Sequence, residues 1–122
     1  MNDLYALQGT WEQIAFDLGS GVAPAAYDAA GTVMTVSGTH FSVSSSEGTL
    51  LLEGAFRLHP NTTPKAVDWL DSIGQDADKA LPAIYTIEGD QFMFVVGDLG
   101  VRPTVFRTAP GVVMRWFVRR VT

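Results

Sequence analysis

The chain has 122 residues and a formal net charge of −5, from 8 Lys and Arg against 13 Asp and Glu. This length suits one domain with a core of its own, and the acidic balance lacks the basic surface that binding to nucleic acid or anionic membranes requires. The chain contains no cysteine, which excludes disulfides, zinc–thiolate sites and thiol nucleophiles.

The first half of the chain alternates apolar and polar residues with the period of a half-buried strand. In the run that ends at Leu58, Leu52 and Phe56 share one face, whereas Glu53 and Arg57 point the other way. A short helical turn is also predicted within residues 24–30. Strands are predicted at Gly9–Leu18, Thr32–Val36, His40–Ser44 and Thr49–Leu58.

A hairpin is the clearest signal in the second half, because Gly89-Asp90 separates two runs rich in β-branched and aromatic residues. Lys65–Leu70 fits either a strand or a helical turn, and a further helical turn is predicted at residues 77–80. The predicted strands of this half are Ala83–Glu88, Phe92–Val96, Thr104–Thr108 and Val112–Val121.

Several of these strands are apolar on both faces; Phe92 and Phe94, for example, alternate with Met93 and Val95. An open sheet would leave one such face and two edges in water, whereas a closed sheet encloses one face and has no edges. We therefore predict an all-β fold for residues 1–122: a small antiparallel lipocalin-like (calycin-type) barrel of about eight or nine strands with one or two short helical turns. A two-sheet sandwich is the alternative. The outer apolar face would pack on a helix or on a second subunit, which favours a homodimer.

Four motifs carry a resemblance that spans nearly the whole chain. They are LQGTW at residues 7–11, PKAVD at 64–68, IYTIEGD at 84–90 and RPTVF at 102–106. Their order resembles a bacterial family of uncharacterised lipocalin-like domains, abundant in planctomycetes, with the pattern LQGTW, PKxID, GIYELEGD and RPTEF. The resemblance implies a small barrel but no substrate. Ala83 and Val105 depart from the family pattern, where Gly and Glu are usual.

Gly9 and Trp11 also resemble the Gly-x-Trp signature of lipocalins. That resemblance implies that Trp11 plugs the closed end of the barrel and that a late arginine, Arg119 or Arg120, packs across its ring. From the residues themselves, Asp68 lies in an apolar context and needs a partner if it is buried. We expect Arg102 to pair with it and to hold the barrel rim.

Candidate site residues follow from the aromatic and titratable side chains. Tyr85, Trp69 and Arg57 are predicted to line a ligand cavity toward one mouth of the barrel. Tyr85, Asp68 or His40 would move the proton if the barrel were an enzyme. Neither histidine has a neighbour at a recognised ligand spacing, and the acidic residues at 68–78 lack the calcium-loop pattern. No metal and no cofactor are expected.

Three functions fit these observations. Binding of a small, mostly apolar molecule is favoured by the 47% hydrophobic and only 17% charged composition. The alternatives are a barrel enzyme of the isomerase or cyclase type, and a protein-interaction module with a filled barrel, such as an inhibitor or immunity-type partner. The sequence shows no leader and no apolar run long enough to span a membrane, so we expect a cytoplasmic protein.

Overall fold

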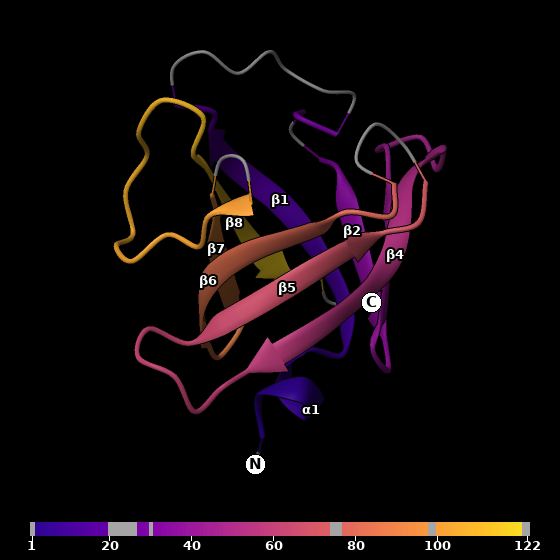
Figure 1. The fold of residues 1–122 in the computed structure, drawn as a ribbon. Helices are drawn as coiled ribbons and strands as arrows, with labels where there is room; N and C mark the ends of the chain where they lie inside the picture. The colour runs from indigo at the N-terminus through magenta and orange to yellow at the C-terminus, as the bar shows by residue number, and fades with distance from the viewer. Residues whose placement is uncertain (1, 20–26, 30, 74–76, 98–99, 121–122) are drawn as a thin grey trace.

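The computed structural model describes residues 2–19, 27–29, 31–73, 77–97 and 100–120. Across these ranges the strands form one closed antiparallel barrel, in which each strand pairs with the next and β8 returns to β1 (Figure 1). The predicted all-β, small lipocalin-like barrel is confirmed, and the sandwich is not adopted. The elements are α1 (Asp3–Leu7), β1 (Gly9–Asp17), β2 (Val33–Ser37), β3 (His40–Ser44), β4 (Leu50–His59), β5 (Ala66–Asp71), β6 (Ala80–Glu88), β7 (Gln91–Val96) and β8 (Val113–Arg119).

Aromatic rings fill much of the barrel interior, because the alternation along the strands turns one apolar face inward. Phe92 lies among them: its ring centroid is 5.8 Å from those of Trp11 and Phe94 and 5.9 Å from that of Phe117. Such tilted and stacked pairs add about 0.5–1.5 kcal/mol each beyond the burial of apolar area. The interior is therefore the main core of the protein.

A second, smaller core lies outside the barrel. The segment between β7 and β8 runs over the outer face of β6, β7 and β8, where Phe106 and Val112 pack against the buried side chains of Ile84, Val95 and Met114. The chain itself thus covers part of the outer apolar face that was expected to meet a helix or a second subunit.

The prediction of a strand at Thr104–Thr108 is wrong, because this segment of the chain is irregular. Its apolar residue Phe106 is partly buried by packing on the barrel wall rather than by strand pairing. Lys65–Leu70, where strand and helix were alternatives, belongs to β5, which pairs with β4 and β6. The helical turn expected at residues 77–80 is a plain turn that leads into β6.

The two ends of the barrel differ. The short helix α1 lies under one end (Figure 1), where the Asn2 side chain caps it by accepting a hydrogen bond from the backbone N–H of Tyr5. Residues 27–29, which belong to the β1–β2 connection, lie toward the opposite end (Figure 1). Of the helical turn predicted within residues 24–30, only these three residues are described.

Candidate functional site

Trp11 closes the end of the barrel at which α1 lies, and its side chain is fully buried. Its indole Nε1 donates to the backbone carbonyl of Leu7, 2.8 Å away, at the end of α1. The guanidinium carbon of Arg119 lies 4.3 Å from the centroid of the Trp11 ring. Arg119 also donates to the carbonyls of Gln8, at 2.6 Å, and Ala6. One tryptophan and one arginine thus tie α1 to both β1 and β8.

Gly9 makes room for this contact. Its φ is +115°, and a Cβ at this position would lie 3.1 Å from Nη1 of Arg119. A side chain here would be strained, and the guanidinium of Arg119 would have to shift by a few tenths of an ångström. Of the two candidate arginines, Arg119 covers Trp11, whereas Arg120 lies 3.6 Å from Glu12.

Tyr85 also lies at the closed end rather than at the mouth. Its hydroxyl donates to Oδ2 of Asp3, at 2.7 Å, and Lys65 lies 3.0 Å from the same oxygen. Burial opposes ionisation of Asp3, but the hydrogen bonds from Tyr85 and Lys65 and the Lys65 charge outweigh it, so the Asp3 pKa lies below its usual value. Burial, the hydrogen bond to Asp3 and the Asp3 charge raise the pKa of Tyr85 well above its usual value. Tyr85 therefore stays protonated at neutral pH and acts as a donor, not as a base.

Tyr85→Phe is expected to lower the free energy of unfolding by about 1–2 kcal/mol, because it removes the hydrogen bond between β6 and α1. The folded-state pKa of Tyr85 is raised. Its contribution is therefore complete below the unfolded-state pKa of about 10 and disappears as the pH rises through the folded-state value. Urea unfolding at pH 8 and pH 11 measures it. The difference between wild type and variant should shrink at pH 11, and an unchanged difference would contradict the assignment.

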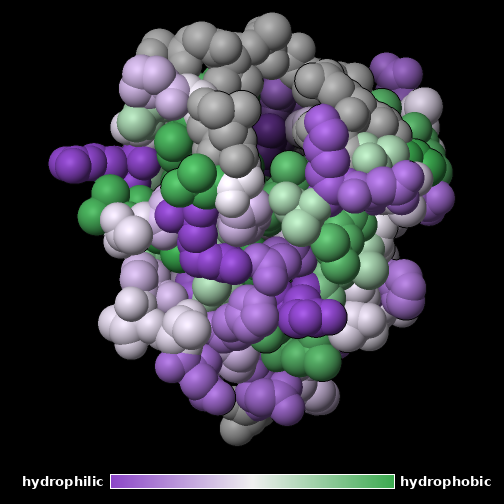
Figure 2. Space-filling model, in the orientation of Figure 1, coloured by the Kyte–Doolittle hydropathy of each residue, from purple (hydrophilic) through white to green (hydrophobic). Residues whose placement is uncertain are grey.

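Asp68 lies on the outer face of β5, where Figure 2 shows hydrophilic residues, and the structure brings it together with Arg102. Oδ1 of Asp68 is 2.6 Å from Nη2 of Arg102, and Oδ2 is 2.8 Å from Nε2 of His59. Arg102 also donates from Nη1 to the carbonyl of Ala83, at 2.9 Å. The pair therefore fastens the β7–β8 segment to the barrel wall, beside a surface groove of about 390 Å³ that His59 and Arg102 border.

Asp68→Asn is expected to cost about 1–2 kcal/mol of unfolding free energy at neutral pH. Burial opposes ionisation of Asp68, but the hydrogen bonds from His59 and Arg102 and their charges lower its pKa overall. A lowered folded-state pKa gives stability that is complete above the unfolded value of about 3.9 and is lost as the pH falls below it. Urea unfolding at pH 6 and pH 3 should show a larger loss of stability in the wild type than in the variant, by about the 1–2 kcal/mol that Asp68 contributes.

The rate of tryptic cleavage tests separately whether the ion pair holds the segment between β7 and β8 to the barrel wall. Release of Arg102 should speed tryptic cleavage after the exposed Arg107 in Asp68→Asn. Glu47→Gln, at an exposed carboxylate in the β3–β4 turn, is the matched control and should leave the cleavage rate unchanged. Equal rates in Asp68→Asn and wild type would show that the ion pair does not hold the segment.

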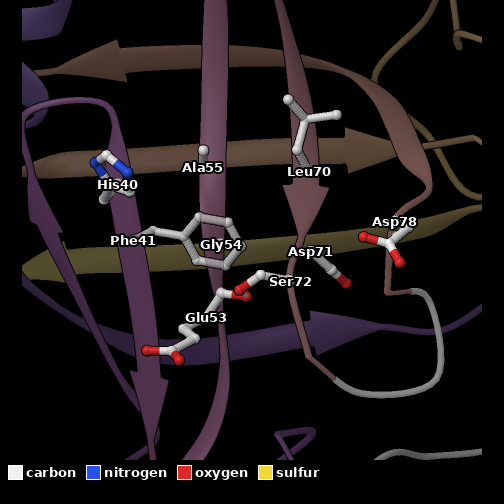
Figure 3. Close-up of a pocket in the computed structure, with 9 residues that line it drawn as sticks. All are labelled: His40, Phe41, Glu53, Gly54, Ala55, Leu70, Asp71, Ser72 and Asp78. Atoms are coloured by element: carbon white, nitrogen blue, oxygen red, sulfur yellow. Dashed lines mark hydrogen bonds between the residues drawn. The ribbon is translucent and has the colours of Figure 1, made fainter.

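His40 lies on β3, at a groove of about 670 Å³ across β3, β4 and β5 (Figure 3). Gly54 lies on β4, the middle strand of this groove, and a Cβ on it would come within 2.1 Å of the Leu70 carbonyl oxygen on β5. Close approach of the β4 and β5 backbones therefore requires glycine here. Asp71 and Asp78 lie on the far side of the groove from His40 in Figure 3. The described residues show no hydrogen bond from the His40 ring to these carboxylates.

The predicted site residues do not form one site. Trp69 is buried on the inner face, its ring centroid 5.0 Å from that of Phe94. The prediction that Arg57 lines the interior is wrong: Arg57 is exposed and pairs across the sheet with Asp68, on the outer face. Tyr85 and Asp68 lie on opposite faces of the sheet, so they cannot act together on one substrate.

A polar cluster that sequence reasoning missed lies on the inner face, away from α1. Arg115 of β8 pairs across the sheet with Phe94 and donates from Nη1 to Oδ1 of Asp28 and to Oε1 of Gln13, the latter at 3.3 Å. The guanidinium carbon also lies 5.0 Å from the centroid of the Tyr27 ring. Gln13 in turn donates to the Tyr27 carbonyl at 2.9 Å. The β1–β2 connection is thus anchored inside the barrel.

Apolar side chains remain half-buried near the same end. Leu52, Leu81 and Val96 pack on the interior cluster from strand ends that lie away from α1. Trp69 Nε1 is buried and has no hydrogen-bond partner among the described residues. The interior thus combines an apolar wall with hydrogen-bond donors toward the end that α1 does not close.

The chain matches no protein-family model, and a search of curated proteins found no match. No helix in the described parts of the chain is long and apolar enough to cross a membrane. In the same parts, no group of three or more His, Asp or Glu side chains could hold a metal ion. The fold and the contacts described above therefore carry the functional argument.

Proposed function

We propose that the protein binds a small, mostly apolar molecule inside the barrel, through the end opposite α1. The main observation is the asymmetry of the interior. Trp11, Arg119 and α1 seal one end, whereas the ion pair of Arg115 and Asp28 lies inside the barrel toward the other. Apolar pockets with a few well-placed polar groups are typical of small-molecule sites. Within this proposal the chain is a bacterial, cytoplasmic lipocalin-like domain, as its motifs suggest.

A series of straight-chain alcohols tests this proposal. If the alkyl chain enters the barrel, the affinity of 1-hexanol, 1-octanol and 1-decanol should rise by up to about fourfold per CH₂, since each buried CH₂ contributes about 0.8 kcal/mol. Isothermal titration calorimetry measures this. A matched variant with a wider wall, Phe94→Leu, should shift the longest tolerated chain upward. Absence of saturable binding for every alcohol would refute a ligand-binding interior.

An interaction module with a filled barrel is the second candidate, and two observations favour it. Rings such as Phe92 and Phe117 already occupy the interior. The apolar side chain of Ile14, in the β-bulge of β1, is 54% exposed. Exposed apolar side chains are typical of protein interfaces. Under this alternative, Ile14→Asp would abolish self-association in sedimentation velocity or binding of a protein partner, and no alcohol would bind. The enzyme alternative gains no support from Tyr85, Asp68 and His40, which the structure does not bring together.

A further inference from the structure

Arg115 is a charged residue on the wall of an apolar interior. Its neighbours on β8, Val113 and Phe117, are buried on the same face, and Phe94 lies opposite on β7. The Arg115 side chain is 13% exposed and that of its partner Asp28 only 2%. The barrel therefore encloses an almost fully desolvated ion pair.

The pair anchors the β1–β2 connection, but anchoring alone does not require buried charges. Removing two charges from water costs several kcal/mol per ion, and apolar residues of similar size are often equally good or better for stability. An ion pair on the wall of an apolar interior is therefore a candidate recognition group. The two charges also neutralise each other, which limits what a ligand can bring with it.

Several N–H donors of the Arg115 guanidinium make no hydrogen bond within the described residues. Both of the hydrogen bonds that Arg115 makes within the described residues come from Nη1, to Asp28 and Gln13. The Nε and Nη2 groups carry three more N–H donors, which a guanidinium presents in a fixed planar fork. Trp69 supplies another: its Nε1 is buried without a partner in the described parts of the chain, and its ring packs on Phe94, the residue opposite Arg115.

We propose that Arg115 and Trp69, on either side of Phe94, form the polar end of the interior site and select an apolar ligand with an uncharged hydrogen-bond acceptor, such as a ketone, ester or amide carbonyl. Arg115 and Trp69 offer hydrogen-bond donors, so the ligand must carry a hydrogen-bond acceptor. Asp28 already neutralises Arg115, so a carboxylate would add an uncompensated charge to a desolvated space. Asp28 is thus a specificity residue that rejects apolar acids. This inference rests on the proposed binding function.

Three ligands of equal chain length test the proposal: 2-decanone, decanoate and 1-decene, which has no strong acceptor. Their affinities are measured by displacement of the neutral fluorescent probe N-phenyl-1-naphthylamine. The wild type should bind 2-decanone at least about tenfold more tightly than either of the other two, the effect of one hydrogen bond to a charged donor. Equal affinities for 2-decanone and 1-decene would overturn the inference but leave the binding function intact. Failure of the probe and of all three ligands to bind would overturn both.

Variants of Arg115 and Asp28 test whether the ligand preference depends on these two charges or only on the shape of the interior. Asp28→Asn leaves the guanidinium without its carboxylate, so decanoate should become the tightest of the three ligands. The double variant Arg115→Met/Asp28→Asn lacks both charges; its preference for 2-decanone over 1-decene should fall to about threefold, the effect of the neutral Trp69 donor alone, and decanoate should remain the weakest ligand because its carboxylate would be buried without a counter-charge. The double variant and the wild type alone decide the matter if Asp28→Asn proves unstable. Tighter binding of decanoate than 2-decanone to the wild type would contradict the role of Asp28.

Discussion

Trp11→Ala is expected to lower the free energy of unfolding by about 3–5 kcal/mol, the range for removing a large buried aromatic side chain. Trp11 is fully buried and contacts Phe92 within the core. Its loss also removes the hydrogen bond to Leu7 and the stacking surface for Arg119. Because α1 is only five residues long and the Trp11 and Arg119 contacts join it to β1 and β8, we expect it to detach. Urea unfolding measures the energy, and amide hydrogen exchange at residues 3–7 reports the detachment.

Trp11→Phe is the matched control. It keeps an aromatic ring beneath Arg119 but loses the Nε1–Leu7 hydrogen bond and part of the volume, so a loss of about 1–2 kcal/mol is expected. If Trp11→Ala cost no more than Trp11→Phe, or if residues 3–7 kept their protection from exchange in both, Trp11 would not be the plug that holds α1.

The second large effect concerns the ion pair of Arg115 and Asp28. Arg115→Met is expected to cost about 3–5 kcal/mol of unfolding free energy, because it removes the guanidinium that pairs with the buried Asp28 carboxylate. The side chain of Asp28 is only 2% exposed, so water cannot compensate. Asp28→Asn is expected to have a cost of the same order, because it leaves the guanidinium with only the Gln13 acceptor and the Tyr27 ring.

The double variant Arg115→Met/Asp28→Asn should cost far less than the sum of the two single changes. A coupling energy of at least about 2 kcal/mol is expected in the double-mutant cycle, measured by urea unfolding at pH 7. The surface pair of Arg120 and Glu12, with side chains 50% and 38% exposed, is the control. Its coupling should stay below about 1 kcal/mol. Additive costs at Arg115 and Asp28 would mean that the two side chains do not form a buried pair in solution.

Much of the barrel could be predicted because alternation along a strand is a local property of the sequence. The range predicted for β3, His40–Ser44, matches the structure, and the two-faced pattern of Phe92 to Val95 fits a wall buried on both sides. The error at Thr104–Thr108 has a physical cause. Residue type showed that Phe106 needed burial, but it could not show whether strand pairing or packing on the outer wall would provide it.

The short helix α1 was missed because five residues carry little periodicity. The available signal was Asn2 followed by Asp3, a cap and an acidic first turn, but no apolar stripe followed it.

The candidate site was harder to predict because its contacts join distant parts of the chain. Arg115 and Asp28 are 87 residues apart in sequence, so no local pattern pairs them. A usable signal was present on β8, where Arg115 alternates in phase with Phe117 and Arg119 and therefore shares their inward face. Arg57 was misassigned for a related reason: strand register, which decides the face, depends on pairing partners that the sequence alone does not give.

Native mass spectrometry of freshly purified protein, compared with its denatured mass, tests the binding function most directly. The account predicts an additional mass of a few hundred daltons that is lost on denaturation, or, for a protein purified empty, a one-to-one adduct after addition of 2-decanone. The adduct should be absent or weak with decanoate. A bare mass that stays bare in the presence of 2-decanone, 1-decanol and decanoate would contradict the account and leave a filled barrel as the better description.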